Sequence, residues 1–190
     1  MRLTTRDLVL LTRMGEQYAV RTDDFGAIAG TAPTRTLQLL ARYRKAGLVK
    51  TGRFLHGEPA YHWLTRKGLH ELDLPYKEVP PSPLLLRHHH FVNVVRHILE
   101  TRPETASGEW VSERSIRQQG RSFSHPPDGL LVLNEKHIAI EVELVQKSAQ
   151  RQEEIAKDLA AFDEVWLFVA PGVHCSHFKH LPLTTEVLDI

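Results

Sequence analysis

Apolar residues recur at helical spacing through the first part of the chain. A first helix is expected after the capping residues Thr4 and Thr5, and a second over 23–29. A turn with Pro33 at its end precedes a third helix over 34–46, which stops at Gly47. This third helix has side chains at helical spacing: Leu37, Leu40, and Tyr43 or Arg44. Two short strands, 48–50 and 60–64, then complete a unit of three helices and a hairpin.

The second part of the chain combines helical patterns with patterns of period two. Residues 85–100 carry apolar side chains over a broad face, which is typical of a helix packed on a sheet. Along the strand expected at 137–144, one face is apolar and the other carries Ala139, Glu141 and Glu143. The remaining expected elements are strands at 109–112, 130–133 and 165–170 and a polar helix at 146–162. The predicted order is therefore αβββαβ.

Charge divides the chain into two unlike parts, although all 190 residues together carry a formal net charge of only +1. Residues 1–74 hold twelve Lys and Arg against seven Asp and Glu, a net of +5, whereas residues 75–190 hold twelve against sixteen, a net of −4. The segment 75–83 contains four prolines and predicts a linker. We expect a basic domain at 1–74 that meets a polyanion, and a more acidic domain at 84–190.

Composition disfavours several classes of protein. Hydrophobic residues make up 42% and charged residues 25%, so wholesale disorder is not expected. No apolar run approaches the length of a membrane span, and residues 1–13 lack the apolar core of a secretion signal. We therefore expect a cytoplasmic protein with no membrane partner. The single Cys175 rules out an internal disulfide, and the absence of glycine-rich phosphate loops disfavours ATP-driven or dinucleotide chemistry.

The first unit has the element order of a winged helix-turn-helix. The runs ARYRKAGLV at 41–49 and YHWLTRKGL at 61–69 resemble the winged-helix transcription regulators of the MarR and PadR kind. The resemblance implies double-stranded DNA as the partner and a homodimer on paired half-sites. The candidate DNA-binding residues, suited to base edges or phosphates, are Thr34, Arg35, Gln38 and Arg42 in the third helix and Arg53 and His56 in the hairpin loop. The alternative is a solvated helix face in a module that docks a protein.

Carboxylates at two neighbouring strands carry the candidate chemistry of the second unit. Pro127-Asp128 and Glu141-Val142-Glu143, in the order αβββαβ, resemble the PD-(D/E)xK nuclease fold. The resemblance implies that Asp128 and Glu141 bind a divalent metal that activates water. Glu143 stands where that family has a lysine, and Lys147 is a candidate replacement. Three carboxylates on one face would suit Mg²⁺ or Mn²⁺. The alternative is an acidic face of a strand in a domain without catalysis.

Two groups of histidines favour metal binding only weakly. His88, His89 and His90 are consecutive, and consecutive side chains on a helix point in different directions. A second group, spaced at three residues, lacks a neighbouring acid or a further cysteine: His174, His177 and His180 beside Cys175.

A third resemblance spans nearly the whole chain. HFVNVVR at 90–96, residues 110–114, PDG at 127–129 and IEVE at 140–143 follow a winged helix in this succession. The succession is similar to the replication-relaxation family of plasmid and mobile-element proteins. It implies a DNA-binding accessory or regulator of plasmid replication, relaxation or transfer, with replication or mobilisation proteins as further partners. It does not imply catalysis.

Three hypotheses follow for an α+β chain built as a winged helix-turn-helix and a nuclease-like domain. The first is a DNA-binding accessory or regulatory protein whose nuclease-like domain is inactive and serves dimerisation or partner contact. The second is a metal-dependent DNA endonuclease guided by the winged helix, in which Asp128, Glu141, Glu143 and Lys147 would be catalytic. The third is a protein-interaction adaptor that binds no DNA.

Overall fold

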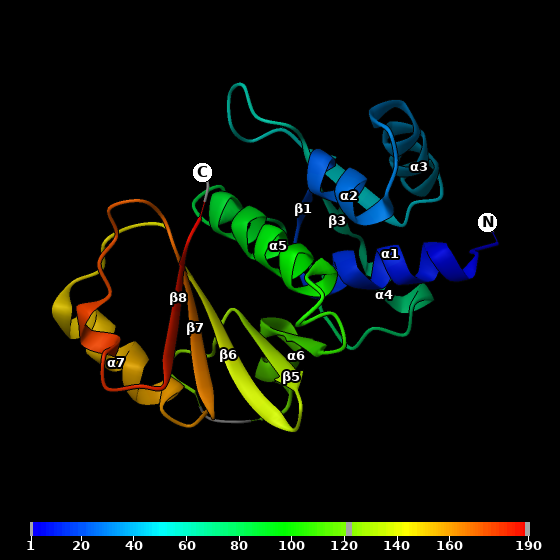
Figure 1. Cartoon of the computed structure of the whole chain (residues 1–190). Helices are drawn as coiled ribbons and strands as arrows, with labels where there is room; N and C mark the ends of the chain where they lie inside the picture. The colour runs from blue at the N-terminus through cyan, green and yellow to red at the C-terminus, as the bar shows by residue number, and fades with distance from the viewer. Residues whose placement is uncertain (1, 121–122, 189–190) are drawn as a thin grey trace. The chain divides into compact units, whose positions relative to one another are not determined.

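The computed structural model describes residues 2–120 and 123–188. The chain divides into two compact units, Met1–Val94 and Val95–Ile190 (Figure 1). Both units combine helices with a β-sheet, so the predicted α+β class is confirmed. No helix in the described ranges is both long and apolar enough to cross a membrane.

The first unit packs helices around a small antiparallel sheet with the strand order β1-β3-β2. One apolar core joins the first three helices to the sheet, with Leu11 and Tyr43 fully buried in it. The elements are, in order, α1 (Thr5–Glu16), β1 (Val20–Arg21), α2 (Thr22–Ala29), α3 (Pro33–Lys45), β2 (Val49–Gly52), β3 (Tyr61–Leu64) and α4 (Arg66–Glu71).

The ends of these helices follow from local chemistry that the sequence predicts. The Thr4 side chain accepts a hydrogen bond from the Asp7 amide, and the Asp7 carboxylate accepts one from the Thr4 amide, which together cap α1. α2 ends at Gly30, whose φ of +56° lies in the left-handed region that glycine adopts without strain. Pro33 occupies the first turn of α3, where its missing N–H costs no helical bond.

The second unit is built on a five-stranded sheet with the order β4-β5-β6-β7-β8. β5 is antiparallel to both of its neighbours, β4 and β6, while β7 pairs in parallel with β6 and with β8. α7 lies against one face of this sheet (Figure 1), and its Ile155 and Leu159 join Val165 and Leu167 of β7 in the core. The elements after α5 (Leu86–Thr101) are β4 (Glu109–Ser112), α6 (Glu113–Gln118), β5 (Gly129–Leu133), β6 (Lys136–Glu143), α7 (Ala149–Leu159), β7 (Glu164–Val169), a 3-10 turn (Ser176–Phe178) and β8 (Leu183–Val187).

The division between the units falls inside α5, later than the proline-rich segment 75–83 that the sequence marks as a linker. The reason is that residues beyond the prolines pack on the first unit. Leu86 is fully buried with Ala19, Tyr61 and Trp63. Residues 75–94 therefore belong structurally to the first unit.

Candidate functional sites

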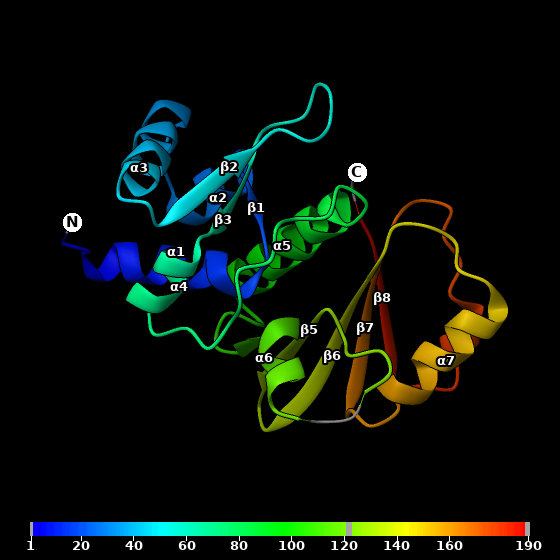
Figure 2. The same ribbon diagram turned by 180° about the vertical axis from the view of Figure 1, so that it is seen from behind.

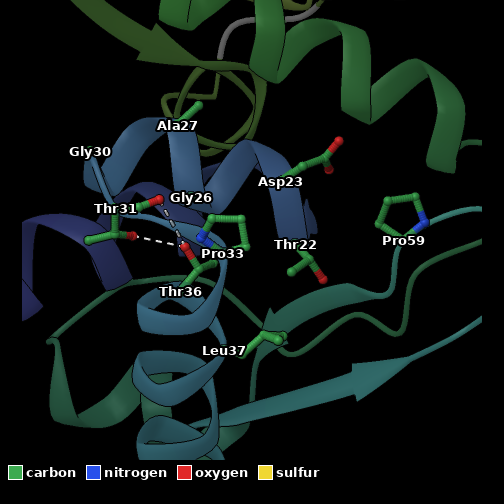
Figure 3. A pocket seen from close by; sticks show the side chains of 10 residues that line it. All are labelled: Thr22, Asp23, Gly26, Ala27, Gly30, Thr31, Pro33, Thr36, Leu37 and Pro59. Carbon is green, nitrogen blue, oxygen red and sulfur yellow. Dashed lines mark hydrogen bonds between the residues drawn. The ribbon is translucent and has the colours of Figure 1, made fainter.

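The first candidate site is built on the turn between α2 and α3 (Figures 2 and 3). Gly26 of α2 lies so close to α3 that a Cβ there would stand 3.0 Å from the Thr36 Oγ1 atom. The Thr36 hydroxyl donates to the Ala32 carbonyl at 3.1 Å and lies 2.9 Å from the Thr31 hydroxyl. These contacts fix the angle at which α3 leaves the turn, and α3 is followed by the hairpin β2–β3 (Figure 2).

α3 has a buried side and an exposed side. The buried residues are Thr36, Leu39, Leu40 and Tyr43. The exposed residues are Pro33, Thr34, Arg35, Leu37, Gln38, Ala41, Arg42, Arg44 and Lys45. The predicted DNA-binding residues of α3 thus lie on the exposed side. Leu37, the first apolar residue of the predicted helical spacing, lies there as well, and 57% of it is exposed.

Two of the predicted DNA-binding arginines have partners within the unit. The Arg35 guanidinium donates to the Gln38 side-chain oxygen at 3.3 Å, so these two candidate residues lie side by side. The Arg42 guanidinium donates to the Asp7 carboxylate of α1, which also accepts from the Tyr43 hydroxyl at 2.5 Å. Arg42 is therefore tied to the helix packing, while 42% of its side chain remains exposed.

The Asp7 carboxylate carries the charge that holds Arg42. Burial raises the pKa of Asp7, but hydrogen bonds from Tyr43 and Thr4 and the charge of Arg42 outweigh this, so the net shift is downward. The carboxylate is thus ionised at neutral pH.

The loop that joins β2 to β3 supplies the remaining predicted residues. Arg53 and His56 are exposed in this loop. Phe54 beside them packs against the rings of Tyr61 and Trp63, which fixes the base of the loop. The structure thus places both predicted loop residues at the surface of the hairpin.

A cavity of about 530 Å³ opens beside the turn between α2 and α3. Its walls come from α2, the turn, the first turns of α3 and Pro59 at the end of the hairpin loop (Figure 3). Small and apolar side chains dominate the lining, and Leu37 contributes the largest of them. The hydrophobic pattern of the sequence does not predict this cavity, because the cavity forms only where two helices and a loop pack together.

The second candidate site lies where β5 and β6 pair. Gly129 pairs with Ile140, so Asp128, one residue earlier, stands opposite Glu141. Glu141 and Glu143 lie on the face of β6 that also carries Ala139, whose methyl group is in the core under α7. The structure therefore brings the three predicted carboxylates to one region. Glu141 is only 1% exposed and Glu143 only 3%, so they do not form a solvated strand face.

Lys147 reaches this region from the segment between β6 and α7. Its Nζ atom lies 2.5 Å from Glu143 Oε1 and 3.8 Å from Glu141 Oε1. Burial raises the pKa of Glu143, although the ammonium of Lys147 acts in the opposite direction. Two buried acids beside each other are thus partly neutralised by one lysine.

His125 is a member of this cluster that the sequence did not single out. Its Nε2 atom lies 2.7 Å from Glu141 Oε1, and its Nδ1 atom lies 3.2 Å from a guanidinium nitrogen of Arg151 on α7. Because arginine can only donate, Nδ1 accepts and Nε2–H donates to Glu141. Burial and the charge of Lys147 lower the pKa of His125, which agrees with a neutral ring.

The arrangement of these side chains does not fit a bound metal ion. The Asp128 Oδ2 atom accepts a hydrogen bond of 2.8 Å from the Val142 amide, while Glu141 and Glu143 engage His125 and Lys147. Among the residues that the structure describes, no group of three or more His, Cys, Asp or Glu could hold a metal ion. The predicted ligands are assembled, but one oxygen atom of each carboxylate binds a group of the protein.

The histidine run at the start of α5 has structural contacts. His90 Nδ1 lies 2.8 Å from the Asp24 carboxylate of α2, and both side chains are nearly buried. The ring of His89 stacks on Tyr18 with a centroid distance of 5.1 Å. These contacts hold the start of α5, which belongs to the first unit, against other residues of that unit.

Comparisons of the chain with models of protein families, with curated proteins and with solved structures find no match.

Proposed function

We propose that this protein binds double-stranded DNA through its first unit and acts as an accessory or regulatory factor. The observation that carries the proposal is the succession of α2, turn, α3 and hairpin, with polar and basic side chains exposed along the first turns of α3. This succession resembles a winged helix-turn-helix, in which the second helix of the turn enters the major groove. Arg35 and Gln38 carry the side-chain types that read guanine and adenine edges.

Electrostatics supports the same function. Residues 1–74 carry the net charge of +5, and Arg44, Lys45 and Arg53 are exposed around the candidate base-reading residues. Contacts of this kind to phosphates position a protein on DNA and supply much of its affinity. Double-stranded DNA is therefore the partner that the first unit fits best.

In this proposal the second unit is a nuclease-like domain without catalysis. Support comes from the order α5, β4, α6, β5, β6, α7, β7, β8, which contains the predicted αβββαβ order with the short helix α6 and the strand β8 added. Further support comes from Asp128 standing opposite Glu141. Lys147 donates to the Glu143 carboxylate and His125 to the Glu141 carboxylate, and a catalytic metal would need these carboxylates as ligands. Such a domain can serve homodimerisation or contact with other proteins. By its resemblance, these would be replication or mobilisation proteins of a plasmid or other mobile element.

The proposal is tested by fluorescence anisotropy with labelled short duplexes over a range of salt concentrations. Affinity falls steeply with salt, and Arg35→Ala weakens binding by about 1–3 kcal/mol if Arg35 contacts a base. The matched control is Arg117→Ala, since Arg117 is an exposed arginine on α6 of the second unit, where it pairs with Glu113. If the protein does not bind DNA at low salt, the protein-interaction adaptor is favoured instead. If Arg35→Ala and Arg117→Ala lose the same affinity for DNA, α3 is not part of the DNA interface.

One observation favours a second candidate, a metal-dependent DNA endonuclease. Lys147 holds an ammonium beside Glu143 and Glu141, which is the charge that the PD-(D/E)xK triplet lysine supplies. The signature of this activity is nicking of DNA that requires Mg²⁺ or Mn²⁺ and is lost in Asp128→Ala and Glu141→Ala.

A further inference from the structure

Leu37 occupies the middle of the exposed side of α3. Thr34 and Ala41, which are three and four residues away from it, share that side and are exposed, and Gln38, the next residue in the sequence, is exposed as well. With 57% of its surface exposed, Leu37 is a large apolar side chain between polar candidate DNA contacts. It lies in the second turn of α3, within the N-terminal part of the helix that reaches base edges in helix-turn-helix proteins.

The cavity beside Leu37 gives this side chain an apolar setting. Pro33, Thr36 and Pro59 line the same cavity, and Figure 3 shows the Leu37 side chain extending away from α3. Asp23 is its charged lining residue, and both carboxylate oxygens of Asp23 accept hydrogen bonds from Arg21, at 2.7 and 2.6 Å. The acid is thus compensated, so this wall does not repel a polyanion as an unpaired carboxylate would.

We infer that Leu37 contacts the 5-methyl group of a thymine in the major groove. The inference rests on the proposed DNA binding and specifies the base class that α3 prefers. In the major groove, the C5-methyl group distinguishes thymine from the other unmodified bases, and apolar side chains are its natural partners. Leu37 is exposed, so its side chain is accessible to such a methyl group.

The expected effect is modest and measurable. Burial of one methyl group contributes about 0.8 kcal/mol, which corresponds to about a fourfold change in affinity. Deoxyuridine removes only the methyl group from thymidine, so its base pairing and its hydrogen-bonding edge are kept.

The experiment begins with duplexes selected by the wild-type protein from a random library that contains no methylated cytosine. The selected duplex is then synthesised with each thymidine replaced in turn by deoxyuridine, and each version is titrated by anisotropy. At one thymine per half-site, the wild type loses about fourfold in affinity. Leu37→Ala binds thymidine and deoxyuridine versions equally, and Leu8→Ala, which changes an exposed leucine of α1, behaves as the wild type.

The outcomes distinguish a failure of the thymine contact from a failure of the proposed DNA binding. Selection of duplexes whose affinity is unaffected by every deoxyuridine replacement overturns the thymine contact and leaves the proposed DNA binding intact. The same holds if Leu37→Ala keeps the full thymidine preference. Failure of the wild type to enrich or bind any duplex at low salt overturns both the proposed function and the contact.

Discussion

His62 is a residue whose environment dictates its protonation. It is 3% exposed, with Nε2 at 2.9 Å from the Thr22 hydroxyl and Nδ1 at 2.8 Å from the Thr51 hydroxyl. The Thr22 hydroxyl donates to the Ala60 carbonyl, so it accepts from Nε2–H, and the ring is satisfied as a neutral group. Burial and the charge of Arg44 lower the pKa of His62 to about 4.

This shift makes the stability of the first unit depend on pH. Between pH 6.5 and about 4 the unfolded chain binds a proton at His62 that the folded chain does not bind, so stability falls as the pH is lowered. From pH 7 to pH 5 the loss due to His62 is about 2 kcal/mol. Urea unfolding at both pH values measures it. The His62→Gln protein has no titrating group at this position, so its free energy of unfolding should fall by about 2 kcal/mol less between pH 7 and pH 5. Equal losses in the two proteins would contradict a buried neutral histidine.

Residues of the candidate sites differ in how far the sequence could specify them. The period of a β-strand places Glu141 and Glu143 on one face, and that relation holds in the structure. The contact between His125 and Glu141 joins residues sixteen positions apart across different elements, so no local pattern encodes it. Arg42 and Asp7 are 35 positions apart in the sequence, so no local pattern predicts their pairing either.

At the scale of elements, hydrophobic spacing and turn chemistry were sufficient for most of the fold. Gly30, Pro33 and Gly47 marked helix ends because backbone conformation there depends on local residue type. No pattern in the sequence indicates β1, because a strand of two residues has no period and forms through its pairing with β3. The exposure of Leu37 was also not predictable, since helical spacing alone does not say which side packs.

Gly68 shows how closely α4 packs on the hairpin. A Cβ at this position would lie 2.3 Å from the Leu48 carbonyl oxygen, which is backbone and cannot rotate away. The Thr65 side chain caps α4 by accepting from the Gly68 amide at 3.0 Å, so the helix start is held against that carbonyl. Glycine is thus required by space rather than by its dihedral angles.

Gly68→Ala is therefore expected to destabilise the protein by about 2 kcal/mol, the usual effect of overpacking. Helix propensity alone would give the opposite sign, because alanine is favoured over glycine in a helix by about 1 kcal/mol. Thermal or urea unfolding measures the sign directly. His70→Ala, at an exposed position of the same helix, serves as the control and should be close to neutral. A more stable Gly68→Ala protein would refute the close approach of α4 to Leu48.

For the whole molecule, the two units have different charges and different chemistry. The segment 75–83 was a reasonable sequence boundary, because prolines and a change of charge coincide there. The structure draws the boundary after Val94, since the Glu78 carboxylate accepts hydrogen bonds from Lys50 and from the Arg66 amide and thereby joins this segment to the first unit. Composition shows where the charge and the proline content of the chain change. Packing determines that residues 75–94, which follow this change, belong to the first unit.

Supercoiled plasmid distinguishes the roles of the two units in one assay. We expect the wild-type protein to retard plasmid at low salt and to leave it supercoiled with Mg²⁺ or Mn²⁺. Retardation follows from the basic first unit, and the lack of nicking follows from carboxylates that already bind Lys147, His125 and the Val142 amide. Nicking by the wild type that requires metal and disappears in Asp128→Ala, with retardation unchanged, would show that a metal displaces these internal partners. The second unit would then be an endonuclease rather than an inactive nuclease-like domain.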